Sequence, residues 1–438
     1  MKKIFTIIAI AAAMTAVNAQ AQNAKSVAAA KAAVEKAQAA AENAKQNTKT
    51  ATWLKYGQTL LDAYNAPAGN VWVGMSAQEL QVLSGGERPR SESQAVVGGQ
   101  PMLKQEFSNK NIYFNQAGQV ALIEVTQPVV DNALAKALDA YKKAAELDTK
   151  AQKTKDIKTA METIATKYTE EAYNAYTMGD MKKASALFEE AVKAAGTAPL
   201  SQIDTNGIYN AGFTAYQAED WSRAKGLFED CLKYNYYGEG GETYAKLADI
   251  ALKLGDKDAA TNYLGQGRAK FPTSQTILIG MINQYIEAGN HDEVFALFKE
   301  AQKNEPNNAS LYYVEGNTRA ELGQIEEAIA SYDKASQVNP NYEYGYIGKG
   351  KLLYDTAVDI QDKANSESDD AKYNALMGEF EKSLKGCIEP FEKAFEVTKD
   401  PGIKRAVAEY LKNACFRFRT EGAEFQTKYD KYAAAAAE

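Results

Sequence analysis

The sequence predicts an all-α protein built as a solenoid of about seven helix-turn-helix units, with a small mixed α/β insertion. Three observations lead to this fold class: a 34-residue period in the small, large and proline positions, glycine turns at the middle of each period, and segments of helical spacing at both ends. Stacked units of this kind contact chiefly their neighbours. The 438 residues therefore need no division into several globular domains.

The period is clearest in the middle of the chain. Glycines such as Gly255, Gly289 and Gly323 stand at the midpoint of each unit, where glycine readily supplies the left-handed conformation that ends a helix. Each second half carries a small or apolar residue, a large one, a small one and a proline in the same register: Ala328, Tyr332, Ala335 and Pro340; Val294, Phe298, Ala301 and Pro306; Ala260, Leu264, Gly267 and Pro272.

This pattern resembles the tetratricopeptide repeat (TPR), a 34-residue helix-turn-helix unit with large, small and proline positions in this order. Each unit has one small or apolar residue on each of its two helices, and these paired marks lie 12 residues apart. Less regular copies of the unit have them at Ala172 and Ala184 and at Gly212 and Ala224. The resemblance implies a right-handed solenoid. It also implies that the first helices line a concave face, where such proteins bind an extended peptide or a partner helix.

Insertions interrupt the first and seventh units. Gly57 and Ala137 match the paired marks of one unit but lie 80 residues apart, and Gly350 and Cys387 match those of another at a spacing of 37. The predicted divisions are 1–19, a signal peptide; 20–48, an N-terminal capping helix; 49–149, the first unit with its insertion at 66–127; 150–342, units two to six; 343–400, the seventh unit with an insertion around 359–371; and 401–438, C-terminal capping helices.

The N-terminus is typical of a secretory signal peptide. A basic start is followed by an apolar run over 4–17 and by small residues, so that cleavage falls after Ala19 or, alternatively, after Ala21. The run is shorter than the ~20 residues that a membrane-spanning helix needs. We therefore expect an exported protein without membrane insertion, in the periplasm of a Gram-negative bacterium or, alternatively, outside the cell.

The net charge bears on the class of partner, and the cysteine content bears on whether disulfide bonds form. The formal net charge of −7 argues against nucleic acid, which is bound by neutralising phosphates with Lys and Arg. Three cysteines are too few for a disulfide framework. Cys231 falls on a small-residue position of the repeat, and we interpret it as core. Cys387 and Cys415 are either buried small residues or a disulfide pair.

Two glycine patterns look like nucleotide-binding motifs, and neither fits its surroundings. The letters LSGG at 83–86 resemble the signature of ABC-type ATPases. They follow a predicted helix that begins with a capping box at Ser76 and Glu79, so they would end a helix rather than begin one. Residues 345–351 have the spacing of a phosphate-binding loop, but Gly350 occupies the small position of a repeat helix. We predict no nucleotide site.

No other pattern points to chemistry. His291 is the only histidine, which excludes two-histidine metal motifs and leaves little for a nucleophilic triad; we expect it at an exposed turn. Asp355, Asp359 and Asp362 share a helix face, and a solvated face accounts for them. We therefore predict no catalytic residue, no metal ligand and no cofactor. A catalytic pair of carboxylates that only folding brings together is the alternative that sequence spacing does not reveal.

Tyrosines concentrate on the first helices of the repeats, where they offer a rigid apolar ring with a polar hydroxyl to a partner. Some of these rings could equally pack between neighbouring helices. By the family's pattern, the side chains facing the groove are Tyr173, Tyr176, Tyr209, Phe213, Tyr216, Asn283, Tyr313, Asn317, Tyr344, Lys351 and Tyr354.

The insertion at 66–127 is the second candidate site. It contains a capped helix, a polar glycine-rich loop over 85–100, and a β-hairpin around the turn at 115–118. A lone hairpin is at best marginally stable in water, so it must pack on the array or on a partner. The insertion either gates or extends the groove, or is a decoration without a ligand.

Together these observations predict a non-enzymatic scaffold or adaptor of the cell envelope, which binds a segment of a partner protein in a tyrosine-lined groove. Two alternatives remain: a glycan or cell-wall binder that stacks sugars on aromatic rings, and an enzyme whose site lies in the insertion.

Overall fold

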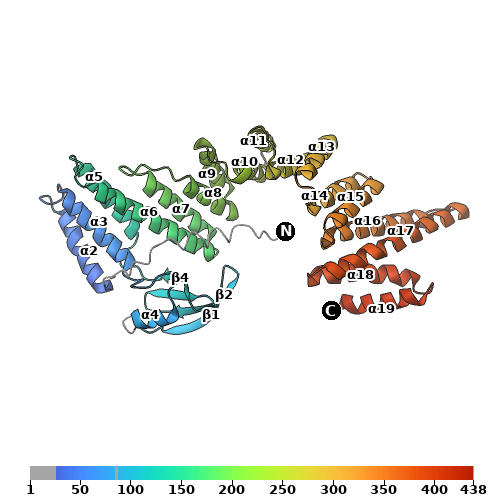
Figure 1. The fold of residues 1–438 in the computed structure, drawn as a ribbon, viewed down its shortest axis with the longest axis horizontal. Helices are drawn as coiled ribbons and strands as arrows, with labels where there is room; N and C mark the ends of the chain where they lie inside the picture. Colours follow the sequence, from blue (N-terminus) through green and yellow to red (C-terminus); the bar gives the residue numbers. More distant parts are fainter. Residues whose placement is uncertain (1–25, 84–86, 438) are drawn as a thin grey trace. The chain divides into compact units, whose positions relative to one another are not determined.

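Figure 1 shows the computed structural model of the protein, which describes residues 26–83 and 87–437. The predicted signal peptide at 1–19 and the predicted helix end at Gly85 and Gly86 lie outside the described residues. The predicted fold class, an all-α solenoid with a small insertion of strands, is confirmed.

The chain divides into two compact units. The N-terminal unit comprises residues up to 238 together with 250–255, and the C-terminal unit comprises 239–249 together with 256–438. Helix α10 (Glu242–Lys253) contributes residues to both.

The N-terminal unit contains helix pairs and the strands of the insertion. Its elements are α2 (Val27–Glu42), α3 (Thr50–Asn65), α4 (Ala77–Leu83), β1 (Ser91–Val97), β2 (Gln100–Glu106), β3 (Lys110–Phe114), β4 (Val120–Val125), α5 (Ala133–Leu147), α6 (Thr154–Thr177), α7 (Met181–Gly196), α8 (Thr205–Gln217) and α9 (Trp221–Lys233).

The C-terminal unit is helical throughout its described part. After α10 its elements are α11 (Lys257–Lys270), α12 (Gln275–Ala288), α13 (His291–Asn304), α14 (Ala309–Glu321), α15 (Ile325–Val338), α16 (Glu343–Asn365), α17 (Asp370–Val397), α18 (Pro401–Phe418) and α19 (Ala423–Ala437). The charged segment around 359–371 lengthens α16 and α17, and only four residues, 366–369, separate the two helices.

One packing rule joins the helices of a pair. A small residue on the first helix receives an aromatic ring from the second, so the two backbones approach closely. A Cβ at Gly57 of α3 would lie 2.7 Å from the ring of Tyr141 on α5, although the insertion separates the two helices in the sequence. Gly350 of α16 and Phe391 of α17 repeat this contact at 2.8 Å. The repeat pattern is therefore a packing pattern.

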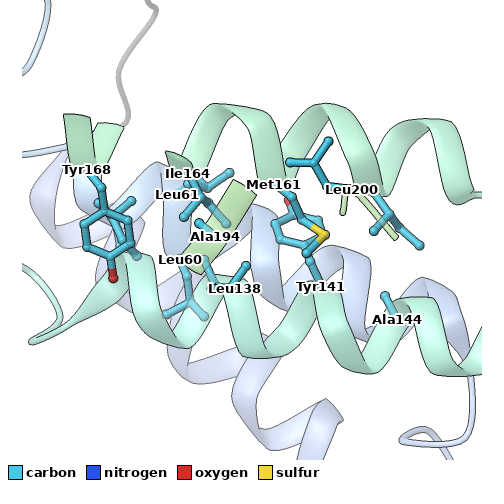
Figure 2. Packing of buried hydrophobic residues seen from close by; sticks show 14 of the residues in the cluster. Leu60, Leu61, Leu138, Tyr141, Ala144, Met161, Ile164, Tyr168, Ala194 and Leu200 are labelled. Atoms are coloured by element: carbon cyan, nitrogen blue, oxygen red, sulfur yellow. The ribbon is translucent and has the colours of Figure 1, made fainter. Parts of the chain in front are cut away.

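The core of the N-terminal unit shows how the helix pairs stack. Figure 2 shows side chains of α3, α5 and α6, among them Leu60, Tyr141 and Met161, packed together between the helices. All three are at least 98% buried. Removing such apolar surface from water contributes roughly 1.5–3 kcal/mol per large side chain, so this layer is a main source of the unit's stability.

Local signals set the helix ends. At the start of α7 and of α9, the carboxylates of Asp180 and Asp220 accept a hydrogen bond from the backbone N–H three residues on, at 3.0 and 3.3 Å. At the end of α12, Gly289 adopts φ 71°. This is the left-handed conformation that the midpoint glycines predict.

The insertion forms a four-stranded antiparallel sheet in the order β1-β2-β3-β4. The predicted hairpin is present as β3 and β4, with Ile112 opposite Ile123. The predicted loop over 85–100 is wrong in part, because Ser91–Val97 forms strand β1. This edge strand exposes most of its side chains, so it lacks the apolar alternation that marks a half-buried strand.

The sheet packs on the helical array. Within the insertion, one face of the sheet packs on the segment of α4, where Met75, Leu80 and Ile112 share a small core. The turn between β1 and β2 meets the end of α6, where a Cβ at Gly98 would lie 3.4 Å from the carbonyl oxygen of Thr177. The insertion therefore adjoins a first helix of the array, next to Tyr176.

All three cysteines are free and buried, Cys387 and Cys415 included. Burial raises the pKa of the Cys387 thiol to about 12 and that of Cys415 to about 11. In the described part of the chain, no helix is both long enough and apolar enough to cross a membrane.

Candidate binding surface

The aromatic residues predicted for the N-terminal unit lie on α6 and α8 and are half-buried. Tyr173 meets the ring of Phe188 edge-on at 5.1 Å, and its hydroxyl accepts a hydrogen bond from the amide of Asn210 at 3.2 Å. Burial of its ring raises the pKa of Tyr173. This tyrosine holds α6, α7 and α8 together.

The other aromatic residues of this group also contact rings of their own unit. Tyr209 lies 5.5 Å from the ring of buried Phe228, and Tyr216 lies 5.3 Å from Trp221 in an edge-on contact. Tyr176 and Phe213 face each other across α6 and α8 at 6.5 Å. These rings therefore pack between helices and remain partly exposed.

The C-terminal unit gathers three tyrosines at one place, here called the tyrosine cluster: Tyr313 on α14, Tyr342 just before α16, and Tyr344 on α16. Their ring centroids lie 5.5–6.1 Å apart, with interplanar angles of 50–78°. Tyr344 is 38% exposed. Burial raises the pKa of Tyr342 to about 12.

The buried ring of Tyr332 packs against this cluster on its inner side. Tyr332 of α15 is 3% exposed, and its ring lies 6.0 Å from that of Tyr313. A Cβ at Gly316 or at Gly348 would lie 2.6 or 2.5 Å from the Tyr332 ring. Glycine at both positions therefore lets the ring lie between α14 and α16, which carry Tyr313 and Tyr344.

Asn317 takes part in this support. Its side-chain oxygen accepts a hydrogen bond from the Tyr332 hydroxyl at 2.8 Å, so it satisfies a buried polar group. Asn283, by contrast, is exposed on α12 and makes no hydrogen bond with its side chain among the described residues. The structure does not join Asn283 to the tyrosine cluster.

The surface continues from the cluster toward α18. Lys351 forms an ion pair with Asp355 one turn further along α16, and this contact raises the pKa of Lys351. Tyr354 meets Tyr410 of α18 edge-on at 5.0 Å. Tyr410 in turn stacks on buried Phe391 at 4.9 Å. Helix α18, predicted only as a cap, thus contributes an aromatic ring.

Tyr342 also borders a hollow of about 550 Å³, lined by Glu305, Pro306, Asn307, Asn308, Ala309, Ser310, Asn339 and Tyr342. The repeat pattern did not predict Tyr342 and Tyr410 as part of this surface. Tyr342 precedes its helix and so lies outside the first-helix pattern, and Tyr410 lies beyond the last recognised repeat. The proline at 340 and the dense tyrosines at 342–346 were the available signal for the former.

The glycines of the apparent phosphate-binding loop have a packing role. Residues 345–351 lie inside α16, so their amides belong to the helix. Gly348 and Gly350 make room for the rings of Tyr332 and Phe391. The capping box before LSGG is confirmed, because the Glu79 carboxylate accepts from the Ser76 backbone N–H at 2.8 Å while the Ser76 hydroxyl accepts from the Glu79 N–H at 3.2 Å. The hydrogen bonds that the Ser76 backbone N–H and hydroxyl donate to the Glu79 carboxylate lower the pKa of Glu79.

His291 is the first residue of α13. Within residues 26–83 and 87–437, no group of three or more His, Cys, Asp or Glu side chains is placed to hold a metal ion.

Stacked helix pairs with an aromatic surface on their first helices define a helical-repeat protein. Two family models match the chain, a TPR repeat model over residues 316–356 and a tetratricopeptide repeat model over residues 241–267. These two matches identify tetratricopeptide repeats at residues 241–267 and 316–356 of the chain. No curated protein sequence matches it.

Solved structures of similar fold include YrrB, described as a TPR protein with an unusual peptide-binding site, at 23% identity over 44% of this chain and 95% of that chain, with a TM-score of 0.33. A tetratricopeptide repeat protein from Parabacteroides merdae ATCC 43184 is 16% identical over 57% of this chain and 98% of that one, with a TM-score of 0.38. MamA is 18% identical over 45% and 96%, with a TM-score of 0.33.

Proposed function

We propose that the protein is a non-enzymatic scaffold or adaptor of the cell envelope, and that it binds a segment of a partner protein on the tyrosine-lined surface of α14, α16 and α18. Its TPR repeats support the general role of a protein-interaction scaffold. The envelope location rests on the N-terminal sequence, which is typical of an export signal.

The tyrosine cluster is the observation that carries this proposal. Buried Tyr332 supports it from below, while Tyr344 exposes more than a third of its surface. A tyrosine held in this way loses little conformational entropy on binding and offers both an apolar ring and a hydroxyl. Such rings contribute disproportionately to binding energy at protein interfaces.

Lys351 and Tyr354 extend the surface along α16. The ammonium group of Lys351 is paired with Asp355, and both residues are exposed. A charged group on a partner can exchange with one member of this pair at little cost, because exposed ion pairs of this kind contribute only ~0–1 kcal/mol. The surface therefore offers an apolar anchor next to an exchangeable charge.

The test is crosslinking in cells and affinity capture of the tagged protein, followed by identification of the captured proteins and binding of the purified pair. The key variant is Tyr344→Ala, because Tyr344 is an exposed ring whose loss leaves the buried Tyr332 in place. We expect the specific partner to be lost, with affinity lowered by about 1–2 kcal/mol or more.

Tyr373→Ala is the matched control, since Tyr373 is an equally exposed tyrosine (40%) on α17 outside the cluster. It should capture the partner like the wild type. Equal capture by wild type and Tyr344→Ala would rule out this surface. Loss of capture on addition of cell-wall sugars would instead assign the surface to a glycan.

A further inference from the structure

The tyrosine cluster is shaped as a set of ridges rather than as a flat platform. Tyr342 and Tyr344 are tilted by 53° at 5.5 Å, and Tyr313 meets Tyr342 almost perpendicularly, at 78° and 6.1 Å. A sugar ring stacks best on the open face of one aromatic ring. Rings that stand at an angle to each other instead fit a narrow, ridged ligand.

Hydrogen-bond donors lie beside these ridges. Asn307 and Asn339, each with a side-chain amide, are among the residues that line the hollow next to Tyr342. Asn339 uses its side-chain oxygen to accept from the backbone N–H of Asn341 at 3.0 Å, and its amide N–H groups donate to no other described residue. The Asn307 side chain makes no hydrogen bond to another described residue.

The hollow also has an acidic character. Among its lining residues Glu305 is the one charged side chain, held by the amide of Asn308 at 2.7 Å. Glu343 lies between two members of the cluster and is close enough to raise the pKa of Tyr342. On α16, Lys349 is paired with Asp333 at 2.8 Å, and Lys351 is paired with Asp355. The charge here therefore favours a cationic ligand.

We propose that the tyrosine cluster and its hollow bind a proline-rich segment with flanking Lys or Arg residues, in the polyproline II conformation. This inference rests on the proposed function and names the chemistry of its partner. A polyproline II chain has no internal hydrogen bonds, so its carbonyl groups accept from outside donors such as Asn307 and Asn339. Its prolyl rings pack against aromatic ridges, and its conformation is fixed before binding.

A competing occupant, an amphipathic helix, is disfavoured by the same features. A helix satisfies its own backbone carbonyls, so it would leave the amides of Asn307 and Asn339 without a role. It would also require a broad apolar groove, whereas the lining of the hollow is mainly polar. The polar rim and the tilted rings together favour the polyproline II chain.

The test uses the full chain and three fluorescein-labelled peptides, with binding followed by fluorescence anisotropy. The first peptide repeats the unit Lys-Pro-Pro, the second replaces each Pro by Ala, and the third replaces each Lys by Glu. We expect the first to bind at least about tenfold more tightly than the other two, because both alternatives lose a recognised feature. Comparable binding of all three would overturn the inference.

Two variants test whether the peptide binds at the tyrosine cluster and its hollow. Tyr344→Ala should weaken the Lys-Pro-Pro peptide about fivefold to tenfold, as expected for the loss of one aromatic contact, and Tyr373→Ala should leave it unchanged. Glu305→Gln keeps the acceptor for Asn308 but removes the charge, so it should weaken binding about twofold to fivefold and reduce its salt dependence. Unchanged affinity in both Tyr344→Ala and Glu305→Gln would overturn the inference.

The two proposals can fail separately. If a partner is captured through Tyr344 in cells but no proline peptide binds, the polyproline inference falls and the scaffold function stands. If neither capture nor peptide binding depends on Tyr344, both fall. Competition by cell-wall oligosaccharides, without peptide binding, would also overturn the inference and assign the cluster to a glycan.

Discussion

The aromatic residues on the first helices behave differently in the two units. In the N-terminal unit, Tyr173 and Tyr209 contact Phe188 and Phe228 of the second helices. In the C-terminal unit, Tyr313 contacts Tyr332 of the second helix in the same way, whereas Tyr344 contacts Tyr313 and Tyr342 and is 38% exposed. Tyrosines at similar repeat positions therefore differ in exposure, and Tyr344 offers the more accessible ring.

The glycines around the buried ring differ between the helix pairs that carry Tyr209 and Tyr313. In the N-terminal unit, a Cβ at Gly212 would lie 3.3 Å from Phe228, a tight contact on one side. In the C-terminal unit, Gly316 and Gly348 both approach Tyr332 so closely that a Cβ would lie 2.6 and 2.5 Å away. Tyr332 can therefore fill the space between α14 and α16, and the cluster remains at the surface.

The largest expected effect comes from removing the buried rings. Phe228→Ala and Tyr332→Ala should each lower the free energy of unfolding by about 3–5 kcal/mol, because each leaves a cavity in a closely packed helix pair. Thermal and chemical denaturation followed by circular dichroism measure this loss. Both residues are at least 97% buried.

Partner binding by the same two variants then shows which unit recognises the partner. At temperatures where both variants remain folded, Tyr332→Ala should lose binding and Phe228→Ala should keep it. If Phe228→Ala also abolished binding, the N-terminal surface would share in recognition and the contrast between the units would disappear.

An intermediate effect is expected at Gly348. Gly348→Ala places a methyl group against the Tyr332 ring and should lower the free energy of unfolding by about 1–3 kcal/mol through overpacking. It should also displace the tyrosine cluster and weaken partner binding. Denaturation and binding measurements on the same purified variant test both effects.

Gly226→Ala is the matched control in α9, where a Cβ would meet no atom within 4 Å. The same substitution should there raise the free energy of unfolding by ~0.5–1 kcal/mol, since alanine favours a helix more than glycine does. Equal effects at the two glycines would show that the close contact with Tyr332 does not matter.

The smallest effect is expected in alkaline solution. Burial raises the pKa of Tyr168 in the N-terminal unit and of Tyr342 in the C-terminal unit to about 12 in each case. Between the ordinary pKa of about 10 and these values, the unfolded chain loses the phenolic proton while the folded chain keeps it. The free energy of unfolding should therefore be unaffected below pH ~10 and fall as the pH rises toward ~12.

Ultraviolet titration of tyrosinate formation tests this expectation. Tyr168→Phe and Tyr342→Phe should each remove one late-titrating group and reduce the alkaline loss of stability. A titration curve that is unchanged by either substitution would contradict the raised pKa values. The two variants also show whether the N-terminal and C-terminal tyrosines are equally protected from water.

The repeat pattern by itself determined the helical pairs, because its small and large positions are the residues that pack against each other. The period paired Gly57 with Ala137 across a long insertion, and it placed Gly350 inside a helix rather than in a phosphate loop. These inferences needed only that a small residue on one helix admits a ring from the next. The β3 and β4 hairpin was accessible from its alternation for a similar local reason.

Tertiary structure alone decided which tyrosines are exposed and where the surface ends. A sequence period marks the first-helix position of Tyr209 and of Tyr344 alike, but exposure depends on rings and glycines that arrive from other helices. Strand β1 was missed because an exposed edge strand carries no apolar alternation. Tyr342 and Tyr410 were missed because they lie outside the repeat positions and join the surface only when α16 and α18 pack.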